Sequence, residues 1–196
     1  MEPQDDSTGL TELRTPRLLM RAWREEDKKP FAAMNADPQV MQYFPEVLQE
    51  PESDALVERL RDQHAQYGYT VWALQVLESE HGSADFVGFT GLSHPSFDLP
   101  FEHSEPCVEV GWRLSPPWWG MGLASEAARA AITYGFDVLC LEEIVSFTTP
   151  SNEASWRVME RIGMHRAEEF DHPRAQAWDW WQRHLLYRMS PNDPRP

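Results

Sequence analysis

Segments in which apolar and polar residues alternate recur along the whole chain. Such alternation is typical of β-strands, because successive side chains point to opposite faces of a sheet. It predicts strands over 14–23, 70–78, 84–93, 107–115, 143–149 and, as a final pair, 163–170 and 178–189. Residues 79–83 join the second and third of these strands as a hairpin turn.

Helical periodicity separates several of these strands and predicts helices over 25–35, 51–67, 120–139 and 151–162. In the second helix, apolar residues recur near the helical repeat, and Gly68 is a typical helix end. The chain thus has paired strands, then strand, helix, strand and helix, then a second strand pair. This order predicts a three-layer α/β domain with a mixed sheet.

The chain length of 196 residues is typical of one domain. Polar, proline-bearing residues occupy both ends. We therefore predict a single domain over 12–190, with loose termini at 1–11 and 191–196.

Acidic residues dominate the charge, with 17 Lys and Arg against 32 Asp and Glu and a net charge of −15. Nucleic acid is therefore not an expected partner. No run of about 18 apolar residues occurs and the first residues are acidic, so we expect no membrane span or signal peptide and a cytoplasmic protein. Cys107 and Cys140 lack the spacing of a zinc site; we expect both to be buried and no metal to be bound.

A glycine-containing turn, PPWWGMGLASE from Pro116, connects a predicted strand to the longest predicted helix. Free N–H groups at a helix N-terminus bind phosphate oxygens, and Gly120 and Gly122 lack the Cβ atoms that would block close approach. Ser125 adds a hydroxyl donor. A P-loop would need a Lys here, and a dinucleotide-binding fingerprint would need glycine in place of Ser125. The alternative is that the glycines serve only a tight connection.

A second group of polar residues follows the strand predicted over 143–149. Asn152, Ser155 and Met159 lie at i, i+3 and i+7, so they share one face of the predicted helix. The alternative reading is that Ser151 or Asn152 only caps the helix N-terminus.

The runs WWGMGLASEA and TTPSNEASWRVMERIGM together resemble the coenzyme-A-binding core of the GNAT superfamily of N-acetyltransferases. Residues 15–21 with Asp27, and residues 37–40, are similar to the N-terminal signatures of the branch that includes the ribosomal-protein N-terminal (Rim-type) acetyltransferases. The resemblance extends over 13–189. It implies a three-layer GNAT-like fold of the α+β type, in which a central mixed, largely antiparallel sheet carries helices on both faces.

The resemblance also implies how acetyl-CoA would bind. Backbone amides of the turn would hold its pyrophosphate, with Ser125 as an added donor; the turn residues are Trp119, Gly120, Met121, Gly122, Leu123 and Ala124, and Trp119 stands where Gln or Arg is more general. Trp112 and Leu114 would bind the pantetheine arm through the strand backbone where the sheet splays. Asn152 would hydrogen-bond the same arm.

Acetyl transfer to an amine needs a base, donors for the developing oxyanion and a proton for the leaving thiolate. By the resemblance, a backbone N–H near 112–114 would stabilise the oxyanion and Glu109 would be the base. Much of the superfamily has a tyrosine acid where this chain has Met159, so Ser155 becomes the candidate for orienting or protonating the sulfur. Two alternatives stay open: Glu109 pairs with an arginine of a neighbouring strand, or His94 or His103 is the base.

We therefore predict an enzyme that transfers the acetyl group of acetyl-CoA to a primary amine by direct attack in a ternary complex. The acceptor would be a protein N-terminus or a small amine such as a polyamine, an amino acid or an aminoglycoside. The sequence is compatible with a monomer or a homodimer. Two further hypotheses are a non-catalytic acyl-CoA-binding or regulatory module and an interaction domain without a cofactor.

Overall fold

The structure of the chain, a computed structural model, describes residues 9–77, 82–175 and 179–195. Its eight-stranded sheet has the order β1-β2-β3-β4-β5-β6-β8-β7. The strands are Leu13–Arg14 (β1), Leu18–Arg21 (β2), Val71–Val76 (β3), Ala84–Ser93 (β4), Glu109–Leu114 (β5), Ile144–Thr148 (β6), His165–Asp171 (β7) and Arg183–Met189 (β8). Neighbouring strands are antiparallel except β5 and β6, which run parallel. The predicted mixed, largely antiparallel sheet is confirmed.

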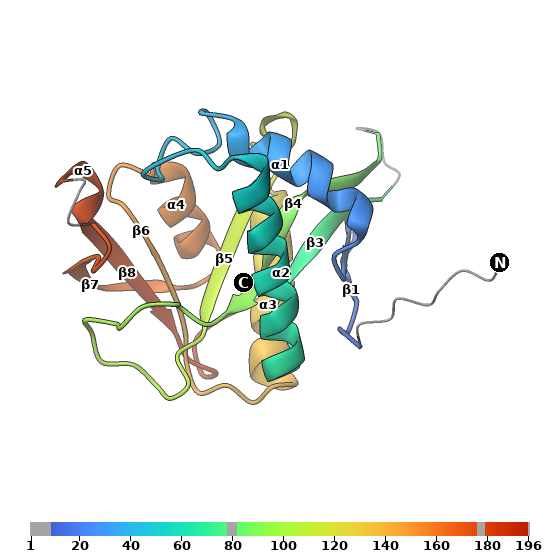
Figure 1. The fold of residues 1–196 in the computed structure, drawn as a ribbon. Helices are drawn as coiled ribbons and strands as arrows, with labels where there is room; N and C mark the ends of the chain where they lie inside the picture. The colour runs from blue at the N-terminus through green and yellow to red at the C-terminus, as the bar shows by residue number, and fades with distance from the viewer. Residues whose placement is uncertain (1–8, 78–81, 176–178, 196) are drawn as a thin grey trace.

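Helices cover both faces of this sheet (Figure 1). The helices are Lys28–Ala36 (α1), Glu50–Tyr67 (α2), Leu123–Asp137 (α3), Glu153–Arg161 (α4) and the short Asp179–Gln182 (α5), with 3-10 turns at Glu25–Asp27 (η1) and Pro116–Trp118 (η2). Helices α1 and α2 pack on one face, and α3 and α4 pack on the other. The three layers predicted from the order of elements are therefore present.

The core between the sheet and α3 follows directly from the alternation of β5. Val110 and Leu114 are buried on the α3 side, while Glu109 and Arg113 belong to the opposite face. Helix α3 presents small side chains to the sheet, and Ala127, Ala128 and Ala131 are completely buried. The small residues let the helix backbone approach the strands closely, which fixes where its N-terminus lies.

A buried ion pair joins the first long strand to the first helical layer. Arg21 Nη1 and Nη2 donate to the two carboxylate oxygens of Asp27 at 2.7 and 2.8 Å. Both side chains are only 1% exposed. Asp27 also accepts a hydrogen bond from Arg24 N at 2.8 Å, so the carboxylate stabilises the start of the helical segment as well.

Two predicted strands differ from the observed ones. The segment 14–23 is divided into β1 and β2 by a tight turn at residues 15–18, in which Thr15 N donates to Leu18 O at 2.9 Å; the same turn also hydrogen-bonds to Glu126 on α3. Within 178–189, a helical turn, α5, precedes β8; Trp178 itself lies outside the described residues. In both places the chain changes direction within the segment, so the strand that the alternation predicts is interrupted or begins later.

Two expectations about burial are also corrected. Cys107 is buried as expected, but Cys140 is exposed in the α3–β6 connection, where its φ of 54° lies in the left-handed region. Leu10, assigned from sequence to a loose terminus, is buried, and the carbonyl of Thr11 accepts a hydrogen bond from Trp72 Nε1 at 2.8 Å. The chain is therefore held against the core before residue 12.

Candidate functional site

The sheet opens between its two parallel strands. Strands β5 and β6 share one register pair, Glu109 with Val145, and Val145 N donates to Val108 O at 2.9 Å. Beyond this point the strands diverge, and a cleft of about 760 Å³ is lined by β5 on one side and Ser146 to Thr149 on the other. The opening gives the cleft unpaired strand backbone along one wall.

The direction of the β5 backbone follows from that one hydrogen bond. Along a strand, the N–H and C=O groups of alternate residues point to the same edge. Because Val108 O points toward β6, the backbone groups of Val110, Trp112 and Leu114 point toward β6 as well. Trp112 and Leu114, both predicted from the sequence as backbone partners of a ligand, line the cleft. Leu114 O already accepts a hydrogen bond from Trp119 Nε1 at 2.6 Å.

The glycine turn lies at one end of this cleft, directly before α3. Gly120 and Gly122 have φ values of 73° and 77°, a left-handed conformation that favours glycine. Gly122 is the N-cap, so the helix begins at Leu123 and not at residue 120 as predicted. In the described chain no acceptor is found for the backbone amides of Gly120 to Ser125; the next amide, that of Glu126, donates to Gly122 O at 3.0 Å. The turn therefore presents a group of free N–H donors to the cleft.

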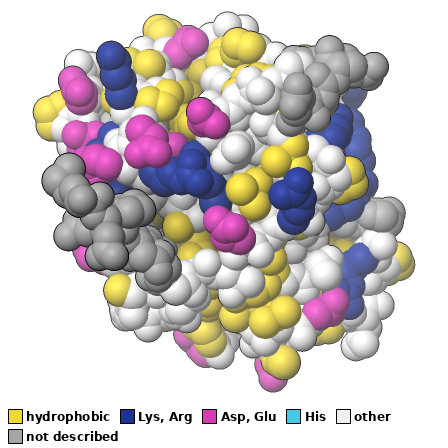
Figure 2. All heavy atoms as spheres, turned by 90° about the vertical axis from the view of Figure 1, so that its right-hand side faces the viewer, with side chains coloured by type: hydrophobic (Ala, Val, Ile, Leu, Met, Phe, Trp, Pro, Cys, Tyr) yellow, Lys and Arg dark blue, Asp and Glu magenta, His cyan; other side chains and the backbone are white. Residues whose placement is uncertain are grey.

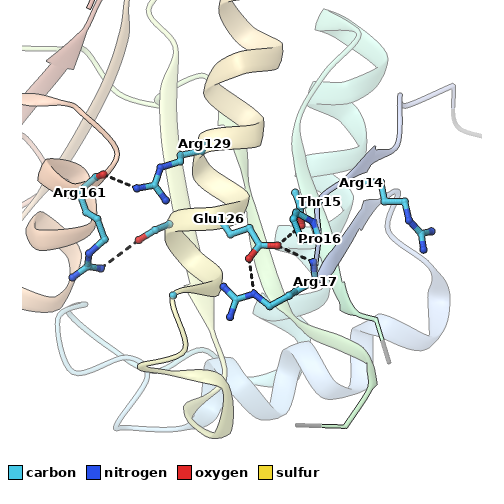
Figure 3. A pocket seen from close by; sticks show the side chains of 9 residues that line it. Arg14, Thr15, Pro16, Arg17, Glu126, Arg129 and Arg161 are labelled. Atoms are coloured by element: carbon cyan, nitrogen blue, oxygen red, sulfur yellow. Dashed lines mark hydrogen bonds and ion pairs between the residues drawn. The ribbon is translucent and has the colours of Figure 1, made fainter. Parts of the chain in front are cut away.

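Glu126, in the first turn of α3, holds this turn against the N-terminal strands. Its Oε1 accepts from Thr15 Oγ1 at 2.6 Å and from Arg17 N at 2.9 Å, and its Oε2 accepts from Arg17 Nε at 2.6 Å. Arg17 Nη1 also donates to Met121 O at 2.7 Å. These bonds fix the glycine turn from a segment more than a hundred residues away in sequence (Figure 3).

A pocket of about 500 Å³ beside the turn is bordered by arginines (Figure 3). Arg17, Arg129 and Arg161 surround the N-terminal turns of α3, whereas Arg14 points away from them. Arg161 Nη1 donates to Ser125 Oγ at 3.3 Å, and Arg129 Nη2 donates to Arg161 O at 2.8 Å. Positive charge gathers here although the chain is acidic, and on the β1 side of the molecule both signs are intermingled (Figure 2).

These arginines were not predicted as site residues. Arg129 lies four positions after Ser125, on the same face of α3, which is a signal that the sequence did contain. Arg161 comes from the end of α4, and only the fold brings it to Ser125.

Asn152 and Ser155 both line the cleft from the start of α4. Asn152 is the N-cap, as the alternative reading held: its Oδ1 accepts from Ser155 N at 3.2 Å, and its Nδ2 donates to Thr148 Oγ1 at 3.0 Å. The Ser155 hydroxyl makes no hydrogen bond within the described chain. Met159, predicted on the same helix face, is buried in the core with 1% exposure.

Glu109 lies on the β5 face opposite α3 and lines the cleft. It is half-buried, and burial raises the pKa of its carboxyl from 4.5 to about 8. The alternative in which Glu109 pairs with an arginine finds no support, because no ion pair among the described residues includes it. An unpaired carboxyl with a pKa close to neutral is suited to proton transfer.

The two histidines predicted as alternative bases lie away from the cleft. His94 Nε2 hydrogen-bonds Tyr69 Oη at 2.9 Å, and its ring stacks on Tyr67 with centroids 3.8 Å apart. His103 Nδ1 contacts its neighbour Ser104 O at 2.9 Å. Neither residue borders the cleft in the described structure.

Two other histidines, His172 and His184, line the cleft instead. Their ring centroids lie 4.8 Å apart, and Trp181 packs against both. Burial lowers the pKa of each histidine to about 4, so both rings are neutral near pH 7. No motif in the sequence marks them, because their proximity depends on the pairing of β7 with β8.

Comparison with known proteins defines the class of this protein. Residues 17–165 match the acetyltransferase (GNAT) domain. The chain therefore belongs to the GNAT family and is an acetyltransferase, a family whose members use acetyl-CoA as co-substrate. The resemblance stated from sequence is confirmed at the level of the family.

Individual relatives support this assignment. YnaD of Bacillus subtilis (strain 168), described as an uncharacterized N-acetyltransferase, is 31% identical over 168 residues, which cover 85% of this chain and 90% of YnaD. A GNAT-family acetyltransferase from Bacillus anthracis has a TM-score of 0.74 at 26% identity, covering 92% of this chain and 99% of its own. RimL, a ribosomal L7/L12 α-N-protein acetyltransferase solved with coenzyme A, shares the fold with a TM-score of 0.70 at 17% identity, covering 92% of this chain and 98% of its own.

No described helix combines the length and the apolar character needed to cross a bilayer. Among the same residues, no three His, Cys, Asp or Glu side chains are grouped so that they could hold a metal ion.

Proposed function

We propose that the protein is an acetyl-CoA-dependent N-acetyltransferase that transfers the acetyl group directly to a primary amine in a ternary complex. The observation that carries this proposal is the cleft between β5 and β6. Free backbone donors lie at one end of this cleft, and an unpaired carboxyl lies on the opposite face of β5. Two substrates can therefore approach the same point from opposite sides of the sheet.

Acetyl-CoA fits the side of the cleft next to α3 and α4. The amides of Gly120 to Ser125 would hold the pyrophosphate, because they have no other acceptor in the described chain and the glycines leave room for close approach. The pocket beside the turn, with Arg17, Arg129 and Arg161, would compensate further phosphate charge.

The pantetheine arm would lie along the open edge of β5. The backbone groups of Trp112 and Leu114 that point toward β6 can bind it as a neighbouring strand would. Asn152 contributes from α4, since an amide side chain has hydrogen-bonding capacity beyond its two observed contacts. Bound there, acetyl-CoA supplies an activated acyl group.

Residues on both faces of β5 would carry out the transfer. Glu109 takes a proton from the attacking amine, directly or through water, once its own carboxyl is ionised. An N–H of β5 near residues 112–114 stabilises the charge that develops on the thioester oxygen. Ser155, whose hydroxyl has no partner among the described residues, orients or protonates the departing sulfur. Met159 is buried and has no acidic group, so it cannot replace a tyrosine there.

The acceptor enters from the face of Glu109, between the loop at residues 39–44 and the histidine pair. Trp181 Nε1 donates to Tyr43 O at 3.0 Å and so connects the two walls of this entrance. A protein N-terminus, as in the Rim-type branch, or a small amine fits the proposal. We keep the predictions of a cytoplasmic monomer or homodimer that needs neither nucleic acid nor a membrane.

Release of free thiol tests the proposal. The purified protein is incubated with acetyl-CoA and panels of small amines and peptides, and Glu109→Gln is compared with Glu12→Gln, which removes an exposed carboxylate far from the cleft. We expect amine-dependent thiol release that falls about a hundredfold or more in Glu109→Gln only. Tight CoA binding without thiol release in any panel would favour the non-catalytic acyl-CoA-binding module instead.

A further inference from the structure

Arg113 is a half-buried cation on the acceptor side of the cleft. It follows Glu109 on the same face of β5, four residues and about 13 Å further along the strand at ~3.3 Å per residue. It lines the same cleft and is half-buried. No carboxylate among the described residues pairs with it.

The surroundings of Arg113 fix its guanidinium without neutralising it. Nη1 donates to Asn35 Oδ1 at 2.6 Å, and the guanidinium carbon lies 4.3 Å from the centre of the Phe44 ring and 5.5 Å from that of Phe89. Asn35 is itself completely buried and donates from Nδ2 to Ser53 Oγ at 2.8 Å. These neutral partners orient the charge through one hydrogen bond and two aromatic faces.

Part of the guanidinium remains unused. Nε is buried and has no hydrogen-bond partner, and no partner in the described chain is found for Nη2 either. An unsatisfied buried donor on a charged group is costly, and in native proteins such a group commonly has a functional reason. Burial lowers the pKa of Arg113 to about 10, so the group stays charged near pH 7.

The charges around the cleft show where an anion would be favoured. The acidic and basic side chains that line it, within the described residues, are Glu109, Arg113, Arg157 and Arg161. Arg157 pairs with Glu153 at 2.6 Å, and Arg161 lies beside Ser125 on the acetyl-CoA side. On the acceptor side, Arg113 alone of these is a cation, and its charge is uncompensated.

We propose that Arg113 selects the acceptor by binding a carboxylate carried by the same molecule whose amine faces Glu109. The inference rests on the proposed acetyl transfer and makes its acceptor more specific: an amine that also bears an anionic group, on a free amino acid or on a peptide side chain. Phe44 lies against the guanidinium, and Glu109 lies about 13 Å back along the strand, so the acceptor would carry its amine and its carboxylate at opposite ends of an apolar or planar part.

Matched acceptors test this specificity. 4-(Aminomethyl)benzoate is compared with 4-(aminomethyl)benzamide, within a panel of other amino acids whose amine and carboxylate lie at opposite ends and their amides, and the peptide amide Ala-Glu is compared with Ala-Gln. We expect the wild type to favour the carboxylate-bearing member by about tenfold or more in kcat/KM, the range of a charge-assisted hydrogen bond. A preference in the first pair points to free amino acids and one in the second to peptide side chains.

Variants assign the preference to Arg113. Arg113→Gln should abolish the discrimination between matched acceptors while leaving the KM for acetyl-CoA unchanged, and Arg113→Lys should retain part of it. Arg166→Gln, which removes an exposed arginine of β7, is the charge-matched control and should keep the wild-type ratio. Equal losses with charged and uncharged acceptors, or a wild-type preference for the amides, would show that Arg113 only anchors Phe44 and Asn35.

A binding measurement separates this inference from the proposed catalysis. In the presence of CoA, N-acetyl amino acids and their amides are titrated against the wild type and Arg113→Gln. If no amine supports thiol release but the N-acetyl acids bind more tightly than their amides only when Arg113 is present, the role of Arg113 stands and the proposed activity fails. Equal binding of acids and amides, or binding of neither, overturns the role of Arg113.

Discussion

Replacing Glu109 by Gln removes the carboxyl that β5 places in the cleft while preserving its shape. The structure sets the size of the effect on stability. Burial raises the pKa of Glu109 from 4.5 to about 8. Between these two pH values the folded chain still holds a proton on Glu109 that the unfolded chain has already released. The free energy of unfolding therefore falls as the pH rises through this window, by about 1.4 kcal/mol per pH unit for one group. The total is at most about 5 kcal/mol and is lost in full above the folded-state pKa.

Urea denaturation of the wild type and Glu109→Gln at several pH values from 4.5 to 9 measures this effect. Other groups titrate in the same range, but the difference between the two proteins isolates Glu109. We expect the variant to gain stability relative to the wild type as the pH rises, with the gain complete near pH 9. A difference that does not depend on pH would refute the placement of a protonated carboxyl in the cleft.

The same variant tests the proposed base. In the wild type, kcat/KM should rise with pH until Glu109 is ionised, near its pKa of about 8. The amine also loses a proton as the pH rises, so acceptors of different amine pKa are compared. If the inflection in the pH profile of kcat/KM stays near pH 8 for every amine and disappears in Glu109→Gln, it reports the ionisation of Glu109. If the inflection instead shifts with the pKa of the amine, Glu109 is not the base.

Three further predictions concern the turn, the buried ion pair and the leaving group. Gly122→Val places a β-branched residue at a φ of 77° and should weaken CoA binding about tenfold or more by calorimetry, whereas Gly68→Val, at a φ of 79° in a helix end away from the cleft, should leave it unchanged. Asp27→Asn leaves Arg21 buried without its counter-ion and should cost about 3–5 kcal/mol in urea denaturation; a loss below about 1 kcal/mol would contradict the burial of this pair. Ser155→Ala should lower kcat with little change in the KM for acetyl-CoA, and the fall in kcat should be smaller for thioesters with a more acidic leaving thiol. The same fall in kcat with every thioester would exclude Ser155 from the proton transfer.

Local signals predicted several elements closely. The strand at 84–93 coincides with β4, and the helix at 51–67 differs from α2 by one residue at its start. Gly68 has the left-handed conformation expected of a helix end. These features depend on residues within a few positions of each other, so the sequence pattern contained the information needed to find them.

The glycine turn was also accessible from sequence, because Gly120 and Gly122 directly precede the helix whose amides they expose. The capping role of Asn152 was accessible for the same reason: a capping side chain bonds within three residues of itself. By contrast, no local pattern shows that the turn within 14–23 also bonds to Glu126, more than a hundred residues away in the chain.

Which histidines line the cleft was decided only by the tertiary structure. His172 and His184 replace His94 and His103 because β8 pairs with both β6 and β7 and so brings the C-terminal histidines to the cleft. The cleft itself exists because β5 and β6 share one register pair before they diverge. By itself, the sequence determined the family, the layers and the glycine turn before α3, since these follow from short-range patterns. That Glu109 and Arg113 lack an ion-pair partner among the described residues depends on which distant residues surround them, and only the folded chain sets those surroundings.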